Sequence, residues 1–598
     1  MSVRNQNIWQ EGLSEDLVGG AAENFAFYIS NIALKSGSSF ALERSGVTAI
    51  VGGNNVGKST LLREIIGSLT TERSDRSTNV LQSAVVDWQG SDADFLAWAS
   101  TVAPYMVLSL SSKGFSANGQ LLPAETLLMY RSHFNQQEVL GPLFQLLVHF
   151  ATARDRFHYV QPTPRRGSWN EPPSHPLHRV EQDPELLRGF QAAAKDIFNA
   201  ELTLDRLGGN LFFRVGKPEL PAPPIDDVDI EYIGQLLALP GLEGQGDGMQ
   251  SALSLLLPVV TSTFPLVLVD EPEAFLHPPQ ARKLGATLAK LAHSRSVQLI
   301  VATHDRHFLT GLLDADEASV SVIRLSRDGD SSVAKHLDSA KLRQAWGKAS
   351  IRHSNLLDGL FHKLVVIAEN ERDCQFFAAA LEELNKHETL PLRPHDVLFV
   401  PSAGKGNIPG LAEVLIASGV PVVASPDLDI LNSEPNVERL YRAFGGDWSG
   451  ISDIYKAATA EFKVSRTPRT NRQVEAIVSG ILSIEPGARY SGQTKSDVSA
   501  ALGVESEWKR LKDYGMAAFK SEHAKAQQLM GELAAHGIVP VHVGELERFA
   551  PQVQVGKGDA WLEAALAAHA HRGAPAQDHL RRILAAGGFT VSNGPSSP

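Results

Sequence analysis

Short apolar runs alternate with amphipathic segments along the first half of the chain. The run Val47–Val51 predicts a buried strand, and a glycine-rich loop separates it from a predicted helix that starts at "KSTLLREII". The runs Pro265–Val269 and Leu299–Thr303 predict two further strands, with a helix of regular leucine spacing between them. Strands that alternate with helices indicate an α/β fold, so we expect these three strands to share one sheet.

A second alternation begins after residue 360. Strands are predicted at 364–368, 397–400 and 421–425, with helices at 371–385 and 409–418. This βαβαβ order predicts a parallel sheet. Mostly helical sequence follows, and "GGFTVSNGPSSP" at the C-terminus has the composition of a disordered tail. We expect three regions: 1–350 with an insertion at about 68–240, 361–560 with a core at 362–445, and 561–598 with a C-terminal helix and the tail.

The length and composition are those of a multidomain globular protein. A chain of 598 residues exceeds what one hydrophobic core holds, and no run of 18 apolar residues is present that would span a bilayer. The N-terminal sequence lacks the features of a signal peptide, and the single cysteine, Cys374, cannot form an intrachain disulfide. We therefore expect a cytoplasmic protein without a membrane segment. The net charge of -12 argues against a generally basic surface, although a local groove or bound divalent cations could still hold a polyanion.

The glycine-rich loop fits the pattern G-x-x-x-x-G-K-[ST] between a predicted strand and a predicted helix. Its glycines let backbone amides surround phosphates, Lys58 reaches the outer phosphates, and Ser59 can ligate magnesium. We predict that the loop binds ATP and Mg²⁺ through Gly52, Asn54, Asn55, Gly57, Lys58, Ser59 and Thr60.

Two later strand ends supply residues that complement this loop. The strand "PLVLV" leads to Asp270, which is expected to ligate the magnesium ion, and to Glu271, which is placed to polarise the attacking water. The strand "LIVAT" ends at His304, which can donate a hydrogen bond to the terminal phosphate. The three segments together predict a nucleotide-hydrolysing site.

Acidic residues gather at two strand ends of the second alternation. Glu369 and Asp373 follow the strand at 364–368, and Asp427 and Asp429 follow the strand at 421–425. Because the carboxyl ends of parallel strands meet at one edge of a sheet, the four acids are expected to converge. Crowded carboxylates repel unless cations neutralise them, so we predict ligands for Mg²⁺ or Mn²⁺. Two such ions would suit hydrolysis of a phosphodiester.

The order "GGNNVGKSTLL", "DEPEAFLHP" and "VATHD" resembles the ABC-type ATPase heads of the SMC and OLD (overcoming lysogenization defect) families. The resemblance implies a mixed sheet with a helical insertion, and two ATP molecules held between two protomers, so a homodimer or higher homo-oligomer. It also implies a signature loop, for which "GLEGQGDGMQ" offers Gly246, Gly248 and Gln250. The glutamine that links nucleotide to the insertion is left open among Gln82, Gln136 and Gln161.

The acids of the second region resemble the TOPRIM fold of topoisomerases, primases and OLD nucleases, which has a glutamate after its first strand and a later D-x-D. This resemblance implies roles for Lys512, in stabilising developing phosphate charge, and for Glu545 or Glu547, as a further metal ligand. Asn370 replaces the glycine that the family usually has after the first glutamate; asparagine tolerates positive φ, so we expect the turn to survive. The stretch Phe462–Gln473 holds Lys463, Arg466, Arg469 and Arg472 and could contact a DNA backbone.

The resemblance implies an ATP-gated, metal-dependent endonuclease acting on nucleic acid, either DNA or tRNA. OLD-like proteins include antiphage systems such as Gabija, so a defence role with a partner protein is also implied. A second hypothesis is an ATP-dependent sensor or scaffold with a degenerate TOPRIM module. A third, the ATPase subunit of a transporter or DNA-repair complex, leaves the downstream acids without a role.

Overall fold

The computed structural model describes residues 20–590 except 104, 110–111, 118–119, 155, 170, 172, 225–226, 262–263, 330, 347–354, 464–469, 484–486, 488 and 503–506. The predicted disordered tail lies mostly outside this range, at 591–598. The chain divides into two compact units, Met1–Phe361 and His362–Pro598. The assignment of these units as an ATPase head and a TOPRIM-like domain stays a prediction.

A six-stranded sheet organises the first unit, with strand order β15-β14-β3-β13-β12-β8. Its strands are β3 (Gly46–Val51), β8 (Val148–Ala151), β12 (Leu266–Asp270), β13 (Gln298–Ala302), β14 (Val320–Asp328) and β15 (Ser331–Leu337). Only the β14–β15 pair is antiparallel. The three predicted strands are confirmed and lie side by side as β3, β13 and β12. The predicted mixed sheet and α/β class are therefore also confirmed.

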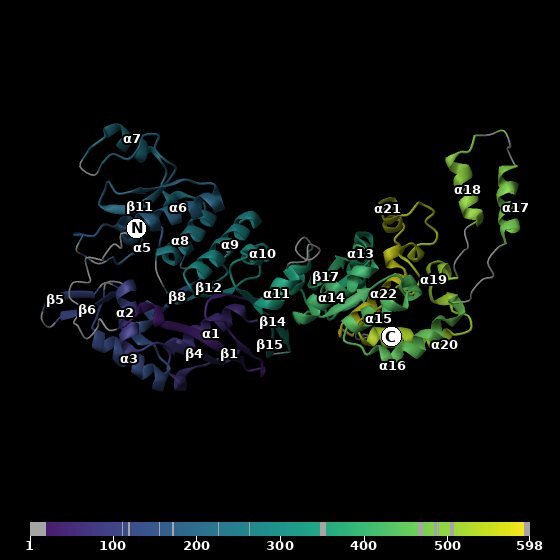
Figure 1. Cartoon of the computed structure of the whole chain (residues 1–598), viewed down its shortest axis with the longest axis horizontal. Helices are drawn as coiled ribbons and strands as arrows, with labels where there is room; N and C mark the ends of the chain where they lie inside the picture. Colours follow the sequence, from purple (N-terminus) through teal and green to yellow (C-terminus); the bar gives the residue numbers. More distant parts are fainter. Residues whose placement is uncertain are drawn as a thin grey trace. The chain divides into compact units, whose positions relative to one another are not determined.

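Helices cover both faces of this sheet (Figure 1). On one face lie α1 (Lys58–Thr70) and an antiparallel sheet of β2 (Ser39–Ala41), β1 (Ala26–Leu34) and β4 (Leu81–Gln89). On the other lie α8 (Asp247–Thr261), α9 (Pro278–Ser294) and α10 (Arg306–Asp314). Alternate residues of a strand face opposite sides, and Leu266 and Leu268 of β12 join the core around α1.

The segment between α1 and α8 is less separate than the predicted helical insertion. Its strand β4 pairs with β1, and its strand β8 pairs with β12. The other elements of the segment are α2 (Asp92–Val102), β5 (Tyr105–Ser109), β6 (Ser112–Ala117), β7 (Gln120–Leu122), α3 (Ala124–Gln137), α4 (Phe144–Leu147), β9 (Thr163–Pro164), α5 (Pro176–Gln182), α6 (Pro184–Phe198), β10 (Leu202–Asp205), β11 (Asn210–Val215) and α7 (Ile230–Ala238). The insertion therefore contributes a strand to the six-stranded sheet and one to the β2-β1-β4 sheet, and it also forms two small sheets of its own, β10-β11-β9 and β5-β6-β7.

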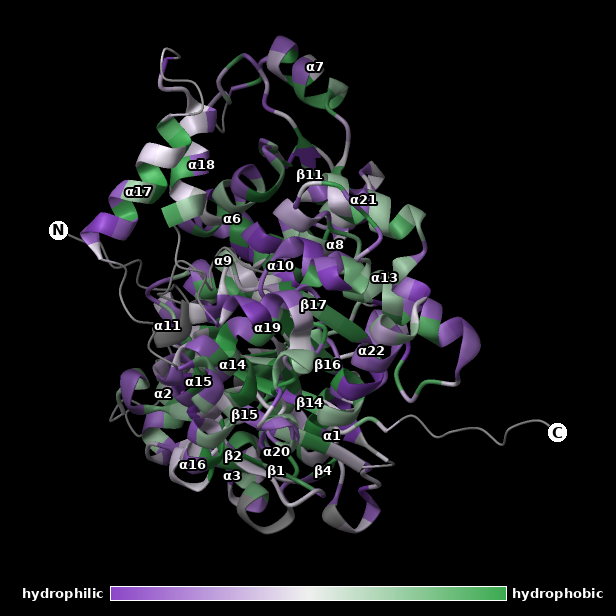
Figure 2. Cartoon of the chain, turned by 90° about the vertical axis from the view of Figure 1, so that its right-hand side faces the viewer, coloured by the Kyte–Doolittle hydropathy of each residue, from purple (hydrophilic) through white to green (hydrophobic). Residues whose placement is uncertain are grey.

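The second unit is built on the parallel sheet β17-β16-β18. Strand β16 (Leu364–Ala368), helix α13 (Glu371–His387), strand β17 (Val397–Pro401), helix α14 (Ile408–Ala417) and strand β18 (Val422–Ser425) confirm the predicted βαβαβ order. All five residues of β16 are buried, and its ribbon has the hydrophobic colour in Figure 2. A strand buried on both faces reads as a continuous apolar run, which explains why this one was predictable.

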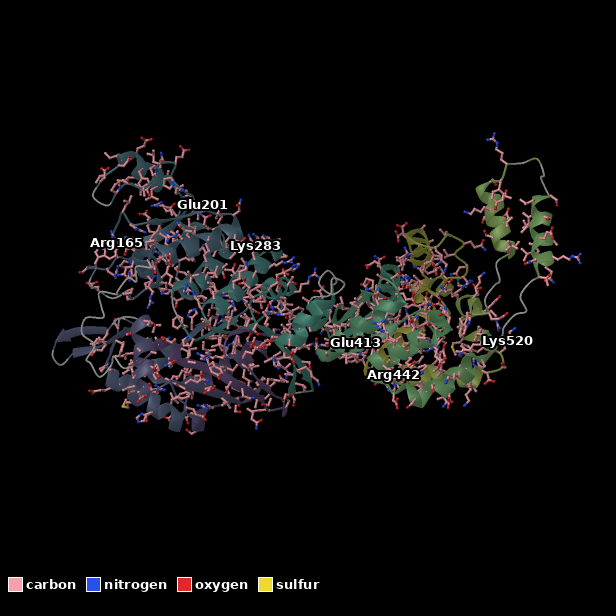
Figure 3. The ribbon with its side chains drawn as sticks, viewed as in Figure 1. Arg165, Glu201, Lys283, Glu413, Arg442 and Lys520 are labelled. Carbon is pink, nitrogen blue, oxygen red and sulfur yellow. The ribbon has the colours of Figure 1, made fainter. Side chains whose placement is uncertain are left out.

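Helices make up most of the remainder of the second unit. They are α15 (Glu434–Ala443), α16 (Trp448–Thr459), α17 (Asn471–Leu482), α18 (Gly492–Leu502), α19 (Lys509–Tyr514), α20 (His523–Ala535), α21 (Asp559–Ala567) and α22 (Ala574–Ala586). Exposed charges of both signs occur on each unit, for example Arg165, Glu201, Lys283, Glu413, Arg442 and Lys520 in Figure 3. Within the described ranges, no helix combines the length and apolarity needed to cross a membrane.

Candidate functional site

The glycine-rich loop joins β3 to α1, as predicted. Gly52 has φ 146°, and a Cβ atom there would lie 2.3 Å from the carbonyl oxygen of Leu325, so the loop needs glycine at this position. Gly57, at φ 102°, caps the start of α1. The side-chain nitrogen of Lys58 donates hydrogen bonds to the carbonyls of Gly52 (2.9 Å) and Gly53 (2.7 Å). Burial lowers the pKa of Lys58, against the attraction of nearby acids that include Asp270.

The other predicted loop residues surround this lysine. Asn54 and Asn55 are exposed, and Asn55 has a positive φ of 62°. Its carbonyl accepts a hydrogen bond from Arg327 of β14 (3.3 Å), so the neighbouring strand supports the loop. Ser59 and Thr60 lie in the first turn of α1. Backbone amides at a helix start fit phosphate oxygens, as the pattern predicted.

Asp270, at the end of β12, meets the loop directly. The hydroxyl of Ser59 donates a hydrogen bond to its carboxylate (2.9 Å), although the two residues are 211 positions apart. Burial raises the pKa of Asp270, which the Ser59 hydrogen bond partly offsets. A hydroxyl and a carboxylate in contact are the oxygen ligands that Mg²⁺ prefers. The two predicted magnesium ligands are therefore brought together.

Two glutamates flank His304. Its Nδ1 lies 3.6 Å from a carboxylate oxygen of Glu271 and 3.4 Å from one of Glu273. The backbone N–H of His304 also donates to Glu273 (3.0 Å), and burial raises the pKa of Glu273. Glu271 is half exposed and has a left-handed φ of 52°, so its side chain is free to reach solvent beside Asp270. Glu273 was not predicted, although it lies within the same "DEPEAF" motif.

A buried arginine from the insertion holds the segment Asp270–Pro272 in place. Arg156 is 2% exposed, and its guanidinium donates to the carbonyls of Asp270, Glu271 and Pro272. Burial lowers the pKa of Arg156 to about 10, so the group keeps its charge at neutral pH. Sequence reasoning missed Arg156 because its partners are backbone carbonyls more than a hundred residues away, which leave no mark in side-chain patterns.

The candidate signature residues lie at the start of α8. Gln250 is buried, and its amide donates to the carbonyl of Gln245 (2.6 Å). A Cβ atom on Gly248 would lie 2.5 Å from the carbonyl of Phe275, so this glycine packs against the end of the "DEPEAF" segment. The space around Gly246 is open. The side-chain hydrogen bonds of Lys58 and Ser59 go instead to Gly52, Gly53 and Asp270.

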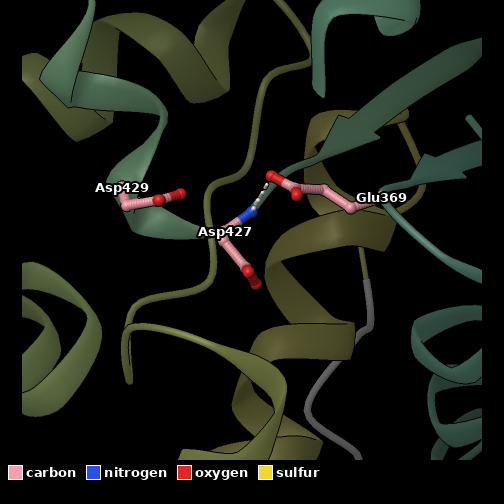
Figure 4. A group of neighbouring side chains, drawn as sticks. All are labelled: Glu369, Asp427 and Asp429. Carbon is pink, nitrogen blue, oxygen red and sulfur yellow. Dashed lines mark hydrogen bonds between the residues drawn. The ribbon is translucent and has the colours of Figure 1, made fainter. Parts of the chain in front are cut away.

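In the second unit, three of the predicted carboxylates converge. Glu369 follows β16, while Asp427 and Asp429 follow β18, and one ligand oxygen of each lies within 4.8 Å of the others. The backbone N–H of Asp427 donates to the carboxylate of Glu369 (3.2 Å), as Figure 4 shows. Among the described residues this is the group whose spacing suits a metal ion, and its all-oxygen donor set fits Mg²⁺ or Mn²⁺.

Burial and mutual repulsion make the negative charge of this group costly. Burial, reinforced by Glu369, Asp373 and Asp429, raises the pKa of Asp427 to about 9. Burial followed by Asp429 raises the pKa of Glu369. A bound cation would reverse both shifts, because an opposite charge favours the ionised form.

Asp373 lies outside this group of three. Its carboxylate accepts a hydrogen bond from the backbone N–H of Asn370 (2.8 Å), so it caps the N-terminus of α13. Burial raises its pKa to about 6. Asn370 has φ -135°, so the expectation that this position needs positive φ is wrong: the residue before a helix adopts extended backbone, which any residue can do.

Two lysines contact Asp429 from different segments. Lys405, in the turn after β17, and Lys512, in α19, each place Nζ 3.1 Å from a carboxylate oxygen of Asp429. Burial alone would lower the pKa of Lys512, but its hydrogen bond to Asp429 and the surrounding acids raise it. Lys512 was predicted at the site, whereas Lys405, in the stretch "VPSAGKGNI" that begins at the end of β17, was not.

The segment that carries Glu545 and Glu547 extends the sheet. Residues 538–541 pair in parallel with β18 through the bridges Ala424–Ile538 and Asp427–Val541. Lys557 forms ion pairs with Glu545 (2.6 Å) and Glu547 (3.5 Å). Glu547 is not one of the three converging acids, and its predicted role as a metal ligand is untested. In the basic stretch Phe462–Gln473, Arg466 and Arg469 lie outside the described residues.

Comparisons with known proteins match part of the chain. A family model described as "AAA domain, putative AbiEii toxin, Type IV TA system" matches residues 162–310, which include Asp270 and His304. The "Old nuclease" of Escherichia phage P2 is 26% identical over 176 residues, 28% of each chain. The "OLD nuclease" of Thermus scotoductus is 28% identical over 221 residues, 35% of this chain and 40% of the relative. The matches thus span well under half of either relative's length.

A comparison with solved structures matches the SMC head domain from Thermotoga maritima, at 14% identity, with a TM-score of 0.27 and coverage of 52% of this chain and 99% of that one. Another match is cbiO1 from Clostridium perfringens, part of an ABC transporter complex, at 11% identity, with a TM-score of 0.26 and coverage of 54% and 94%. The sequence matches to two OLD nucleases and to an AAA domain confirm the resemblance to the OLD family that the motifs predicted.

Proposed function

We propose that the chain is an ATP-dependent endonuclease in which an ATPase head controls a metal-dependent, TOPRIM-like carboxylate site. The observation that carries the proposal is the convergence of Glu369, Asp427 and Asp429 within 4.8 Å in a chain that also joins Ser59 to Asp270. The names of the two relatives, both nucleases, support it.

The carboxylate group would hold Mg²⁺ or Mn²⁺, which when bound supplies a Lewis acid and an activated water for phosphodiester hydrolysis. The chain's own residues prepare this site. The hydrogen bond from Asp427 N–H orients Glu369. Lys405 and Lys512 hold Asp429 from two sides and place positive charge where phosphate oxygens would approach.

At the head, the loop amides and Lys58 would bind the phosphates of ATP, and Ser59 with Asp270 would hold its magnesium ion. Glu271 is placed to orient the attacking water, and His304, held between Glu271 and Glu273, to contact the terminal phosphate. We further propose that Gly246, Gly248 and Gln250 serve the nucleotide of a second protomer in a homodimer, because the space at Gly246 is open and the amide of Gln250 donates to the carbonyl of Gln245 within the same turn.

The proposed substrate is nucleic acid, either DNA or tRNA, and the proposed context is antiphage defence in the cytoplasm with a partner protein. These finer points rest on the resemblance to the OLD family.

Cleavage of supercoiled DNA and of tRNA tests the proposal. Wild type, Asp427→Asn and Lys58→Ala are each incubated with Mg²⁺ or Mn²⁺, with and without ATP. We expect Asp427→Asn to lose at least about a thousandfold in cleavage rate, because the metal supplies several kcal/mol of transition-state stabilisation. Lys58→Ala should alter only the dependence of the cleavage rate on ATP.

The matched control is Asp453→Asn, a substitution of an exposed acid on α16. Absence of cleavage by wild type in every condition would overturn the proposal and favour a sensor or scaffold.

A further inference from the structure

The first unit contains an aromatic cavity beside β8, separate from the phosphate loop. It has a volume of about 560 Å³ and lies between β8, α5 and α8. Its lining includes the aromatic side chains of Phe144, His149, Phe150, Tyr159, His175 and Phe264. A neighbouring cavity of about 490 Å³ shares His149, Phe150 and Tyr159 and reaches Arg156. Volumes of this size suit small-molecule ligands.

Two polar atoms of the lining have no partner among the residues that the structure describes. They are Nε2 of His149, a residue 7% exposed, and Oε1 of Gln145. A buried polar atom without a hydrogen bond is energetically unfavourable, because it has lost its hydrogen bonds to water. Burial lowers the pKa of His149 to about 4, so its ring is neutral and can donate or accept at Nε2 according to its tautomer. A ligand with its own donors and acceptors would satisfy both atoms.

The rings and charges of the lining indicate the ligand's chemistry. The rings of His149 and Phe264 stack, with centroids 5.2 Å apart and an angle of 21° between their planes, and those of Tyr159 and His175 are 5.8 Å apart. Among the residues that the structure describes, no acidic side chain lines the cavity of 560 Å³. Arg179, the arginine among these lining residues, donates to the carbonyls of Val102 and Thr261. Stacking surfaces and neutral polar groups favour an uncharged planar heterocycle over a phosphate.

We propose that this cavity binds an uncharged heteroaromatic molecule of nucleobase or nucleoside size, recognised by Gln145 and His149, and that its binding is coupled to the ATP site. The coupling follows from strand pairing. His149 of β8 pairs with Val267 of β12, the strand that ends at Asp270. Arg156, which lines the adjoining cavity, holds the carbonyls of the segment Asp270–Pro272. A ligand here contacts residues that position Asp270 and Glu271.

Calorimetry on the full chain tests the site. The probes are adenine, guanine, cytosine, uracil and their nucleosides, titrated with the ATP site filled by ATPγS and Mg²⁺ and again without nucleotide. We expect at least one probe to bind in both conditions, with affinities that differ about fivefold or more, because coupling between sites is reciprocal. His149→Phe keeps the ring and removes the nitrogen, so it should weaken binding at least about tenfold, as should Gln145→Leu.

The control is His293→Phe, the same substitution at an exposed position of α9, which should leave binding unchanged. Circular dichroism of each variant checks folding. Three results would overturn the proposal: no probe binds to wild type, both cavity variants bind like wild type, or ATPγS displaces the probe completely. Equal affinity with and without ATPγS would overturn the coupling. All readouts are binding constants, so they are independent of whether the chain cleaves nucleic acid.

Discussion

The two candidate sites differ in the charge that each would gain from a ligand: the first would gain negative charge and the second positive charge. In the first unit, the buried ammonium of Lys58 donates to the carbonyls of Gly52 and Gly53, and burial lowers the pKa of Lys58. In the second unit, three carboxylates converge and burial raises the pKa of Glu369 and Asp427. The expected ligand would reverse the pKa shift at each site. A bound anion would raise the pKa of Lys58, and a bound cation would lower the pKa values of Glu369 and Asp427.

The two sites also differ in how the chain assembles them. The phosphate loop is one continuous segment, fixed by Gly52, where a Cβ atom would lie 2.3 Å from the carbonyl oxygen of Leu325, and by the positive φ of Gly57. The acid site gathers side chains from β16, from the turns after β17 and β18 and from α19. A local motif depends on backbone conformation, whereas a dispersed site depends on strand order and on every contact that holds the strands in register.

The largest expected effect follows from replacing Arg156, which holds the backbone of the proposed ATP site. In Arg156→Lys, a single ammonium replaces a guanidinium that reaches three carbonyls, so Asp270 and Glu271 should shift. We expect kcat for ATP hydrolysis to fall about a hundredfold, the usual result of a misplaced catalytic group, with KM changed less than about threefold. Steady-state kinetics on purified variants measures both.

The matched control for this prediction is Arg295→Lys. Burial lowers the pKa of Arg295 too, and its guanidinium donates to the carbonyl of Val259, away from the segment Asp270–Pro272. This variant should lose stability without losing kcat. Equal kinetic losses in the two variants would show that Arg156 acts through stability alone.

A smaller effect is expected at the acid site from its two lysines. Lys405→Met and Lys512→Met roughly keep the length of each side chain. Each removes a positive charge that now lies beside the Asp429 carboxylate. Each should slow nucleic-acid cleavage about ten- to a hundredfold, as expected for groups that orient a metal ligand. Each should also tighten Mn²⁺ binding, because a competing cation is gone. Titration of cleavage rate against Mn²⁺ separates the two effects, and Lys520→Met, at an exposed position, is the control. Weaker Mn²⁺ binding in both variants would contradict this interpretation.

Sequence was most informative where function depends on adjacent residues. The bounds of β3, β13, β16 and β18 differ from the predicted ranges by about one residue, because buried strands are apolar along their whole length. Arg156 and Lys405 could not be predicted from patterns, since their partners come from distant turns. The prediction for Asn370 was wrong for a local reason. Asn370 and Asp373 form the N-terminal cap of α13, and a residue at the cap position has extended backbone and not a positive φ.

The smallest expected effect concerns stability of the acid site without metal. A pKa of Asp427 raised from 3.8 to about 9 means that the folded protein binds a proton more tightly than the unfolded chain does. That contribution to stability is complete below about pH 4 and is lost as the pH rises toward 9. In EDTA, thermal unfolding of the second unit should therefore shift to lower temperature over this range. Asp427→Asn should weaken the dependence of the melting temperature on pH, by about 2–4 °C for each kcal/mol of relieved repulsion.

Saturating Mg²⁺ at pH 8 should raise the melting temperature of wild type and not of the variant. A shift that Mg²⁺ produces equally in both would place the cation elsewhere, and the contrast in charge between the two sites would no longer explain their chemistry.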